Sequence, residues 1–445
     1  MIDKMRPVYN KTVLENGIRV ISETIPSVPS VSIGVWINVG SRDEKTKENG
    51  VSHFIEHILF KGTKKRSAKR IALALESIGG TLNAFTGREQ TCYYAKVLDE
   101  HSEEALDVLS DILLNSLFHP KDFQKEKGVI IEEIKDVEDS PADFIFDLFV
   151  YNLWGDNSFG RPIMGTVESV LGLERGEVLN YMYETYIPPK IVVATSGNLD
   201  HRKLTRIVES KLTFPPKANS PEAEDADAGQ PSVVEGSSPK SGNKNICSQN
   251  KKTVVKRGIA QTHICLGFPG FDFNHPQKYP ALLLSSILGG GMSSRLFQII
   301  REEKGLAYNI YSFIDFFKDS GICGVYLGTN QKQVKGAIEL VLKEFTKLKN
   351  NRLSLTELEN TKYHLKGNLI LNSESTSSRM NRLARQEIYS QEYLTLEKTI
   401  ASIEKVKAKD VVEVANQLLD SDKLSVVILG PVPQNLTQKI NWGLF

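Results

Sequence analysis

The order of apolar and polar positions in the first half of the chain predicts alternating strands and helices. Residues 31–39 (VSIGVWINV) carry an apolar side chain at every second position, as in a half-buried strand. Further strands are predicted at residues 12–22, 81–86, 91–98 and 190–196, with a hairpin signal at Asn16-Gly17 in the first of them. Helices are predicted around residues 53–57 and at residues 68–78, 102–114 and 120–136.

The second half repeats this order of elements. It predicts strands at residues 260–267, 306–314 and 322–329 and helices at residues 278–288, 294–303 and 332–348. Residues 93–113 and residues 323–345 each run from a strand through a polar turn into an amphipathic helix of matching length. Two unrelated α+β domains would look similar at this level, but we interpret the match as an internal duplication. The predicted fold is α+β, with two duplicated domains that each pack a mainly antiparallel sheet with helices.

Residues 214–252 differ in composition from the segments on either side. They are rich in Ser, Pro, Asn, Gly and charged residues, and they cannot bury enough apolar surface to order themselves. We interpret them as a flexible polar linker. The chain then divides into an N-terminal domain, residues 1–213, and a C-terminal domain, residues 253–445.

The composition argues against several classes of binding partner. The net charge is only +1 at pH 7, so no strongly basic surface indicates a nucleic acid or an anionic membrane. No segment approaches the roughly 18 apolar residues of a membrane helix, and the first residues lack the apolar core of a signal peptide. The cysteines form no C-x-x-C pair, which argues against a disulfide framework or a cysteine zinc site: Cys92, Cys247, Cys265 and Cys323. We expect a bacterial cytoplasmic protein, with the mitochondrial matrix as the less favoured location.

The most specific chemical signal is the stretch HFIEH at residues 53–57. On a helix, positions i, i+3 and i+4 share one face, so His53, Glu56 and His57 point into the same space. Two imidazoles can hold one Zn²⁺, and the carboxylate beside them can take a proton from water. The spacing is the inverted form of the commoner H-E-x-x-H order. The alternative interpretation is a pair of surface histidines on an amphipathic helix.

A catalytic zinc site usually needs a third protein ligand. His101 lies in a polar turn and His119 precedes a proline at a predicted helix start, so we expect both to be solvated or to cap a helix. Glu132 and Glu133 follow apolar anchors in the helix at residues 120–136 and are better candidates. Adjacent helical residues point about 100° apart, so only one of the two can face the metal, and composition does not choose between them.

Several segments carry a resemblance to a known family. They are HFIEH at residues 53–57, LNAFTGREQTCYYAK at residues 82–96, YIPPKIVVATSGN at residues 186–198 and RLFQIIREEKGLAY at residues 295–308. Together with the duplicated α+β halves, they resemble the M16 metallopeptidases, the family of pitrilysin, insulin-degrading enzyme and mitochondrial processing peptidase. Length and layout are most similar to bacterial members of the processing-peptidase branch. The polar segment at residues 214–252 is longer than this resemblance leads us to expect.

The resemblance implies a zinc metalloendopeptidase with one Zn²⁺ per chain. It makes His53 and His57 two of the zinc ligands and Glu56 the general base. The third ligand becomes Glu133, which lies 76 residues past His57. It also makes Glu126 a carboxylate that orients a ligand histidine.

The resemblance further implies how a peptide substrate is held. Arg301 and Tyr308 of the second half would reach the substrate near the zinc. An extended peptide would add to a strand edge through main-chain hydrogen bonds at Asn83, Ala84, Phe85 and Thr86. The halves would form a clamshell that closes on the peptide, and the chain would act as a homodimer. The competing hypothesis is a non-catalytic or partner-dependent subunit of a heteromeric processing peptidase, and the intact motif argues against it.

Overall fold

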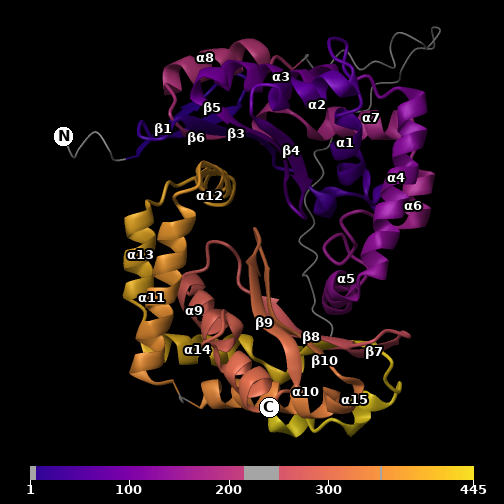
Figure 1. Ribbon diagram of the computed structural model, residues 1–445, viewed down its shortest axis with the longest axis vertical. Helices are drawn as coiled ribbons and strands as arrows, with labels where there is room; N and C mark the ends of the chain where they lie inside the picture. Colours follow the sequence, from indigo (N-terminus) through magenta and orange to yellow (C-terminus); the bar gives the residue numbers. More distant parts are fainter. Residues whose placement is uncertain (1–6, 215–249, 351–352) are drawn as a thin grey trace, which may run out of the picture.

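A computed structural model of the chain describes residues 7–214, 250–350 and 353–445. It has two lobes, each with one sheet and its own helices (Figure 1). This confirms the predicted α+β fold with two duplicated units. Residues 215–249, most of the predicted linker, lie outside the described residues, and Lys252 at its end already begins a strand.

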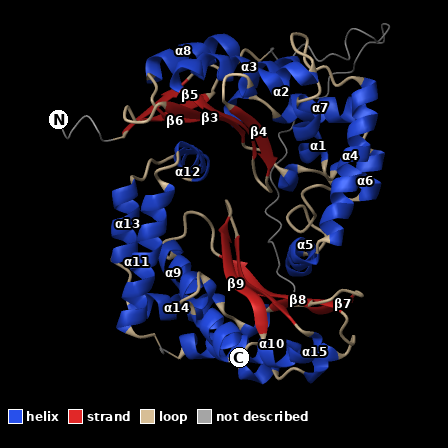
Figure 2. Ribbon diagram, viewed as in Figure 1, coloured by secondary structure: helices blue, strands red, loops and turns tan. Residues whose placement is uncertain are grey.

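The first sheet has six strands in the order β1-β2-β6-β3-β5-β4. Figure 2 labels β3, β4, β5 and β6 of this sheet, beneath helices α8, α3 and α2. The strands are β1 (Val8–Val13), β2 (Arg19–Thr24), β3 (Ser30–Ile37), β4 (Thr81–Thr86), β5 (Thr91–Leu98) and β6 (Ile191–Gly197). Neighbouring strands are antiparallel except β2 and β6, which are parallel. The predicted hairpin joins β1 to β2, and Gly17 in its turn has φ +94°, a conformation that glycine adopts without strain.

The second sheet repeats five of the six strands of the first, and among the described residues only β1 has no counterpart. Its strands are β7 (Lys252–Lys256), β8 (Thr262–Gly270), β9 (Ala307–Phe316), β10 (Gly321–Thr329) and β11 (Ser425–Gly430). They follow the order β7-β11-β8-β10-β9, and only β7 and β11 are parallel. Taken in chain order, β2 to β6 and β7 to β11 therefore have the same positions and directions. This identity of topology confirms the duplication predicted from sequence.

The helices predicted from sequence are all present, one of them with a different type, and the structure adds further helices that were not predicted. The first half contains α1 (Val51–Leu59), α2 (Ala68–Glu76), α3 (Ser102–Asn115), α4 (Pro120–Asp139), α5 (Pro141–Trp154), α6 (Val167–Gly172), α7 (Arg175–Thr185) and α8 (His201–Lys211). The second contains α9 (Lys278–Gly289), α10 (Val334–Lys349), α11 (Leu355–Asn372), α12 (Thr376–Tyr389), α13 (Leu396–Glu404), α14 (Ala408–Leu418) and α15 (Leu436–Lys439). The helix predicted at residues 294–303 is instead a π-helix at Phe297–Glu303, a rare and wider winding. Within the described residues, no helix has the length and apolar character needed to cross a membrane.

Each sheet has two apolar faces, because its strands alternate between two sets of buried side chains. In β3, Ile33 and Val35 enter the main core of the first lobe, whereas Trp36 faces the opposite side. In β11, Ile428 enters the core of the second lobe, whereas Val427 faces away from it. Among the described residues, helices of the same lobe cover only one of these faces.

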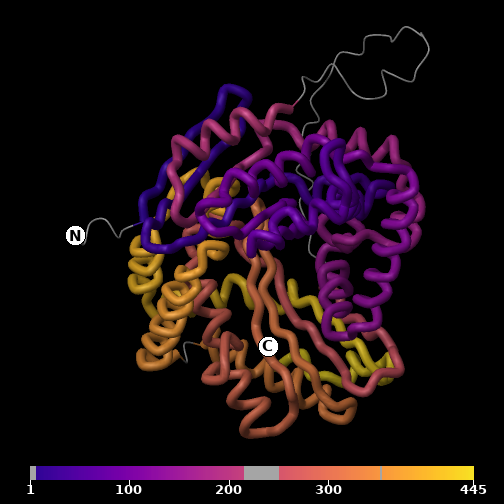
Figure 3. Tube along the Cα trace, turned by 45° about the horizontal axis from the view of Figure 1, so that its top comes forward, coloured from indigo at the N-terminus to yellow at the C-terminus, as the bar shows by residue number. Residues whose placement is uncertain are grey.

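A helix from the opposite lobe covers the other face of each sheet. Helix α12 leaves the second lobe and lies against the first sheet (Figures 1 and 3). It packs on β2, β3 and β6, where Met380 and Leu383 join the cluster around Trp36. Helix α5 of the first half packs on β8 and β11, where Ile145 and Phe149 lie in one cluster with residues of the second sheet. The two lobes therefore interlock through two exchanged helices.

Buried charges reinforce the contact of α12 with the first sheet. The carboxylate of Glu23, 1% exposed, lies 2.9 Å from Arg379 Nη1 and 3.2 Å from Arg382 Nη2. In the other direction, the carboxylate of Glu387 on α12 lies 3.2 Å from Arg19 Nη1. A clamshell motion between the lobes would have to separate these pairs and both apolar contacts. Opening and closing within one chain stays a prediction.

Replacing Glu23 by alanine is expected to lower the free energy of unfolding by about 2 to 4 kcal/mol, because two guanidinium groups lose their carboxylate. The Arg379 and Arg382 side chains keep 16% and 21% of their surface exposed, so solvent screening limits the loss. Urea denaturation followed by circular dichroism measures it. Glu15→Ala, in the exposed β1–β2 turn, is the control and should cost less than about 0.5 kcal/mol. Equal midpoints for the two variants would show that this network does not stabilise the fold.

Candidate metal centre

Helix α1 presents the HFIEH stretch from the core of the first lobe. Its Phe54 and Ile55 are fully buried in that core, which leaves a second face of the helix outside the apolar contacts. His53, Glu56 and His57 lie on this face, as the spacing predicts. The ring centroids of the two histidines are 4.7 Å apart.

The start of α1 is held by a buried glutamate that the sequence did not indicate. Glu44, 3% exposed, accepts hydrogen bonds from the N–H groups of Gly50 (2.8 Å) and Ser52 (2.9 Å) and from the side-chain amide of Asn49 (3.1 Å). The N–H groups at a helix start have no partner inside the helix, so these bonds fix where α1 begins. Burial raises the pKa of Glu44 to about 7, although the hydrogen bonds oppose this shift. Glu44 thereby fixes the position of His53, one residue further along.

Helix α4 supplies the carboxylates. It packs on α1 through Phe123, whose ring centroid lies 4.5 Å from that of Phe54. The carboxylate of Glu133 points to the two histidines, whereas Glu132 points away and lies 2.7 Å from Lys135 Nζ at the exposed surface. Of the two glutamates that the sequence left open, Glu133 is therefore the one beside the histidines.

The donor atoms of His53, His57 and Glu133 suit a zinc ion. Glu133 Oε2 lies 3.3 Å from His57 Nε2 and 3.9 Å from His53 Nε2, and one ligand atom from each residue lies within 4.8 Å of the others. Two donors about 2.1 Å from a tetrahedral zinc ion are about 3.4 Å apart, which is close to these distances. The Glu133 side chain is 43% exposed, so one side of the group stays open to solvent. In the described parts of the chain it is the only group of three or more His, Cys, Asp or Glu side chains that could hold a metal ion.

A buried carboxylate lies at the second ring nitrogen of His57. His57 Nδ1 is 3.4 Å from Glu126 Oε2, and Lys61 Nζ is 3.0 Å from the same oxygen. Glu126 is 1% exposed. A carboxylate in this place fixes the orientation of the imidazole and leaves its other nitrogen as the metal donor. The sequence indicated Glu126 but not Lys61, whose only signal is its spacing of four residues from His57.

The two histidines differ in their electrostatic surroundings. Burial, together with the neighbouring His57, lowers the pKa of His53 to about 4, so its ring is neutral near pH 7. Burial also acts to lower the pKa of His57, but Glu126 and Glu133 outweigh it and raise that pKa to about 9. The hydrogen bond with His57 lowers the pKa of Glu133. A zinc ion would replace the proton on His57, because imidazole binds metals in its neutral form.

Glu56 lies beside the three donors and contacts strand β4. Thr86 Oγ1 donates a hydrogen bond of 2.5 Å to Glu56 Oε2. Burial raises the pKa of Glu56, while the Thr86 hydrogen bond and His57 act to lower it. Strand β4 is the outermost strand of the first sheet, so its edge has no strand partner among the described residues. The residues predicted to pair with a peptide all lie on this edge strand: Asn83, Ala84, Phe85 and Thr86.

Arg301 and Tyr308 lie together but away from the three donors. The guanidinium carbon of Arg301 is 5.2 Å from the ring centroid of Tyr308, which is 76% exposed, and both line an open groove of about 390 Å³ at the start of β9. The opposite end of β9 reaches the first lobe, where the N–H of Lys318 donates to Glu89. Tyr308 lies eight residues before Phe316, about 25 Å along the strand. Within one chain, the described residues show no contact between this pair and the candidate metal centre.

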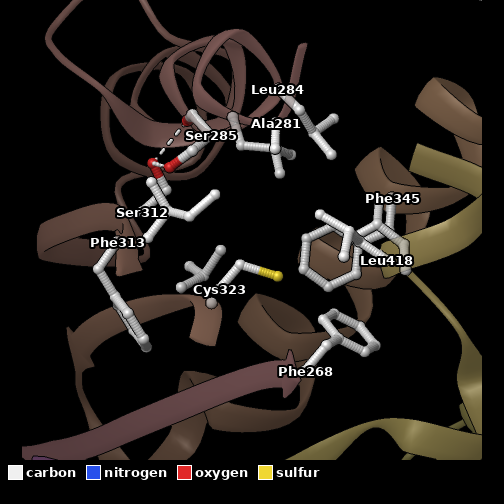
Figure 4. Close-up of a pocket in the computed structure, with 14 residues that line it drawn as sticks. Phe268, Ala281, Leu284, Ser285, Ser312, Phe313, Cys323, Phe345 and Leu418 are labelled. Atoms are coloured by element: carbon white, nitrogen blue, oxygen red, sulfur yellow. Dashed lines mark hydrogen bonds between the residues drawn. The ribbon is translucent and has the colours of Figure 1, made fainter. Parts of the chain in front are cut away.

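A small cavity in the core of the second lobe offers no metal chemistry (Figure 4). Its volume of about 20 Å³ has room for about one water molecule. Leu284, Cys323 and Phe345 line it, together with Ser285 and Ser312, whose hydroxyls are hydrogen-bonded at 3.1 Å. No His, Asp or Glu side chain lines this cavity.

Fold and site together define a class: a two-lobed α+β protein whose first lobe carries an inverted His-x-x-Glu-His motif and a glutamate from a second helix. Comparison with known protein families supports this class. Residues 19–167 match the family model described as Insulinase (Peptidase family M16), and residues 172–365 match the model described as Peptidase M16 inactive domain. The chain belongs to the M16 peptidase family.

Relatives and solved structures extend over nearly the whole chain. An uncharacterized zinc protease of Streptomyces coelicolor is 37% identical over 97% of this chain and 91% of its own length. An uncharacterized zinc protease of Bacillus subtilis is 38% identical over 92% of this chain and 95% of its own length. A protease from Helicobacter pylori superposes with a TM-score of 0.83 at 20% identity, covering 96% of this chain and 100% of that chain, which supports the fold alone.

Proposed function

We propose that the chain is a zinc-dependent metalloendopeptidase that cleaves extended peptide segments. The observation that carries this proposal is the arrangement of α1 and α4, which group His53, His57 and Glu133 as metal donors with Glu56 beside them. The free edge of β4 next to Glu56 supports a peptide substrate. The names of the zinc-protease relatives support the same class.

In the proposed mechanism, a zinc ion held by His53, His57 and Glu133 would polarise the scissile carbonyl and acidify a water molecule. Glu56 accepts the proton of the attacking water and passes it to the leaving amine. Burial raises the pKa of Glu56, which makes the carboxylate a better proton acceptor near neutral pH. Glu126 keeps the ring of His57 in one orientation.

We propose a homodimer with one zinc ion per chain, located in the bacterial cytoplasm. Arg301 and Tyr308 stay proposed substrate contacts. Because they lie at the far end of β9 from the first lobe of their own chain, a second copy is the route by which they would reach a bound peptide. The relatives are bacterial, which is compatible with this location.

Metal removal tests the proposed function. The purified full chain is expected to cut a mixed peptide library, with cleavage sites mapped by mass spectrometry. Chelation with 1,10-phenanthroline should lower the rate about 100-fold or more, and one equivalent of zinc per chain should restore it. A zinc-loaded chain that cuts no peptide would contradict the proposal and favour a partner-dependent subunit.

A further inference from the structure

We propose that Thr86 is a positioning residue for Glu56, so that the peptide-binding edge β4 itself sets the direction of the general base. The proposal rests on the proposed function, in which Glu56 is the base and β4 the peptide edge. It stands on the hydrogen bond of 2.5 Å that Thr86 Oγ1 donates to Glu56 Oε2. This bond joins the strand directly to the motif helix.

The alternation of β4 brings Thr86 to this place. Every second side chain of a strand points to the same face, so Leu82, Ala84 and Thr86 share one face. Leu82 and Ala84 pack on the core that contains the apolar side of α1. Phe85 points to the opposite face, where its ring centroid lies 5.3 Å from that of Trp36. Thr86 is therefore the one polar side chain that β4 directs towards α1.

The backbone around Thr86 is anchored on both sides. Thr86 pairs with Thr91 in the ladder between β4 and β5. The turn that follows is tied to the second lobe, because Glu89 accepts hydrogen bonds from the N–H of Lys318 (3.1 Å) and from Tyr389 Oη (2.8 Å). The backbone that carries the Thr86 hydroxyl is thus held in place by contacts that do not involve Glu56.

The hydrogen bond leaves one carboxylate oxygen for chemistry. Thr86 occupies Oε2, and no other hydrogen bond to the Glu56 side chain occurs among the described residues. Oε1 is then the oxygen that accepts the proton of the attacking water, which requires it to lie within hydrogen-bond reach of that water. The same strand would position both the bound peptide and the carboxylate of Glu56. The strand therefore sets the distance between the scissile bond and the base.

Substitutions that remove or keep the hydroxyl of Thr86 test whether it positions Glu56. Thr86→Val keeps the shape of the side chain and removes the hydroxyl, and we expect kcat about 10-fold lower with KM changed less than about twofold. Thr86→Ser should restore kcat to within about twofold, and zinc content should be unchanged in both. Thr81→Val, at the other end of β4, is the matched control. In a Glu56→Gln chain, Thr86→Val should lower the residual rate no further, because the two residues act as a pair.

A second readout does not depend on activity. In crystals of the metal-free protein, the Glu56 carboxylate should leave its position in Thr86→Val and regain it in Thr86→Ser; Thr86→Ala serves if the valine variant does not fold. An unmoved Glu56 carboxylate or an unchanged kcat in Thr86→Val would overturn the proposal. A change in KM alone would also overturn it, because Thr86 would then be only a peptide contact. An inactive wild-type chain would refute the proposed function instead, and the crystals would still decide whether Thr86 positions Glu56.

Discussion

Replacing Glu56 by glutamine is expected to lower kcat for peptide cleavage by about 10³-fold and to leave the zinc content unchanged. An amide cannot accept the proton of the attacking water, and a general base contributes about 10² to 10⁴-fold to a rate. Zinc should be retained, because Glu56 is not one of the three residues that offer metal donors. Steady-state kinetics with a fluorogenic peptide and plasma emission spectroscopy measure the two quantities.

The control for this substitution removes a carboxylate elsewhere in the same lobe. Glu76→Gln, at the exposed end of α2, should keep both activity and zinc. A Glu56→Gln chain that cleaves peptides at the wild-type rate would exclude Glu56 as the base. Loss of zinc together with activity would show that Glu56 supports the metal donors rather than the proton transfer.

Part of the elements of both lobes could be predicted, because their sequence patterns are local; strands β7 and β11 and helices α5 to α8 and α12 to α15 were not predicted. The alternation over residues 31–39 predicted β3, and the spacing of His53, Glu56 and His57 predicted their shared face on α1. The same alternation did not show what covers Trp36. Helix α12 lies more than 300 residues later in the chain, and no local pattern connects the two.

The parts of the site that could not be predicted from sequence also depend on contacts between elements. The periodicity of β4 gives the face on which Thr86 lies, but it does not tell which residue of α1 lies opposite, so the contact with Glu56 appears only in the structure. The family resemblance, not the spacing alone, singled out Arg301 and Tyr308 as a pair of substrate contacts, and in the structure their side chains lie together. Their distance from the metal donors depends on the direction of the ten-residue strand β9, which the spacing does not contain.

The choice between Glu132 and Glu133 shows how a structure resolves what composition leaves open. Both are glutamates on the exposed part of α4, with equal charge and equal helix propensity. Their directions differ by about 100°, and the buried residues Phe123 and Ile130 fix the rotation of the helix. Glu133 therefore faces His57, and Glu132 faces Lys135.

Glu133→Gln is expected to weaken zinc binding by more than about 100-fold, whereas Glu132→Gln should leave the affinity within about twofold. Loss of an outer carboxylate that only orients a ligand costs about 10 to 100-fold in metal affinity, so loss of a direct ligand should cost more. Competition with a chromophoric chelator on the metal-free chain measures both dissociation constants. The two variants change charge and helix propensity equally, so the difference between them isolates the direction of the side chain. Equal losses would mean that the charge of α4, rather than a bond from Glu133, attracts the metal, and a larger loss for Glu132→Gln would assign the third ligand to Glu132.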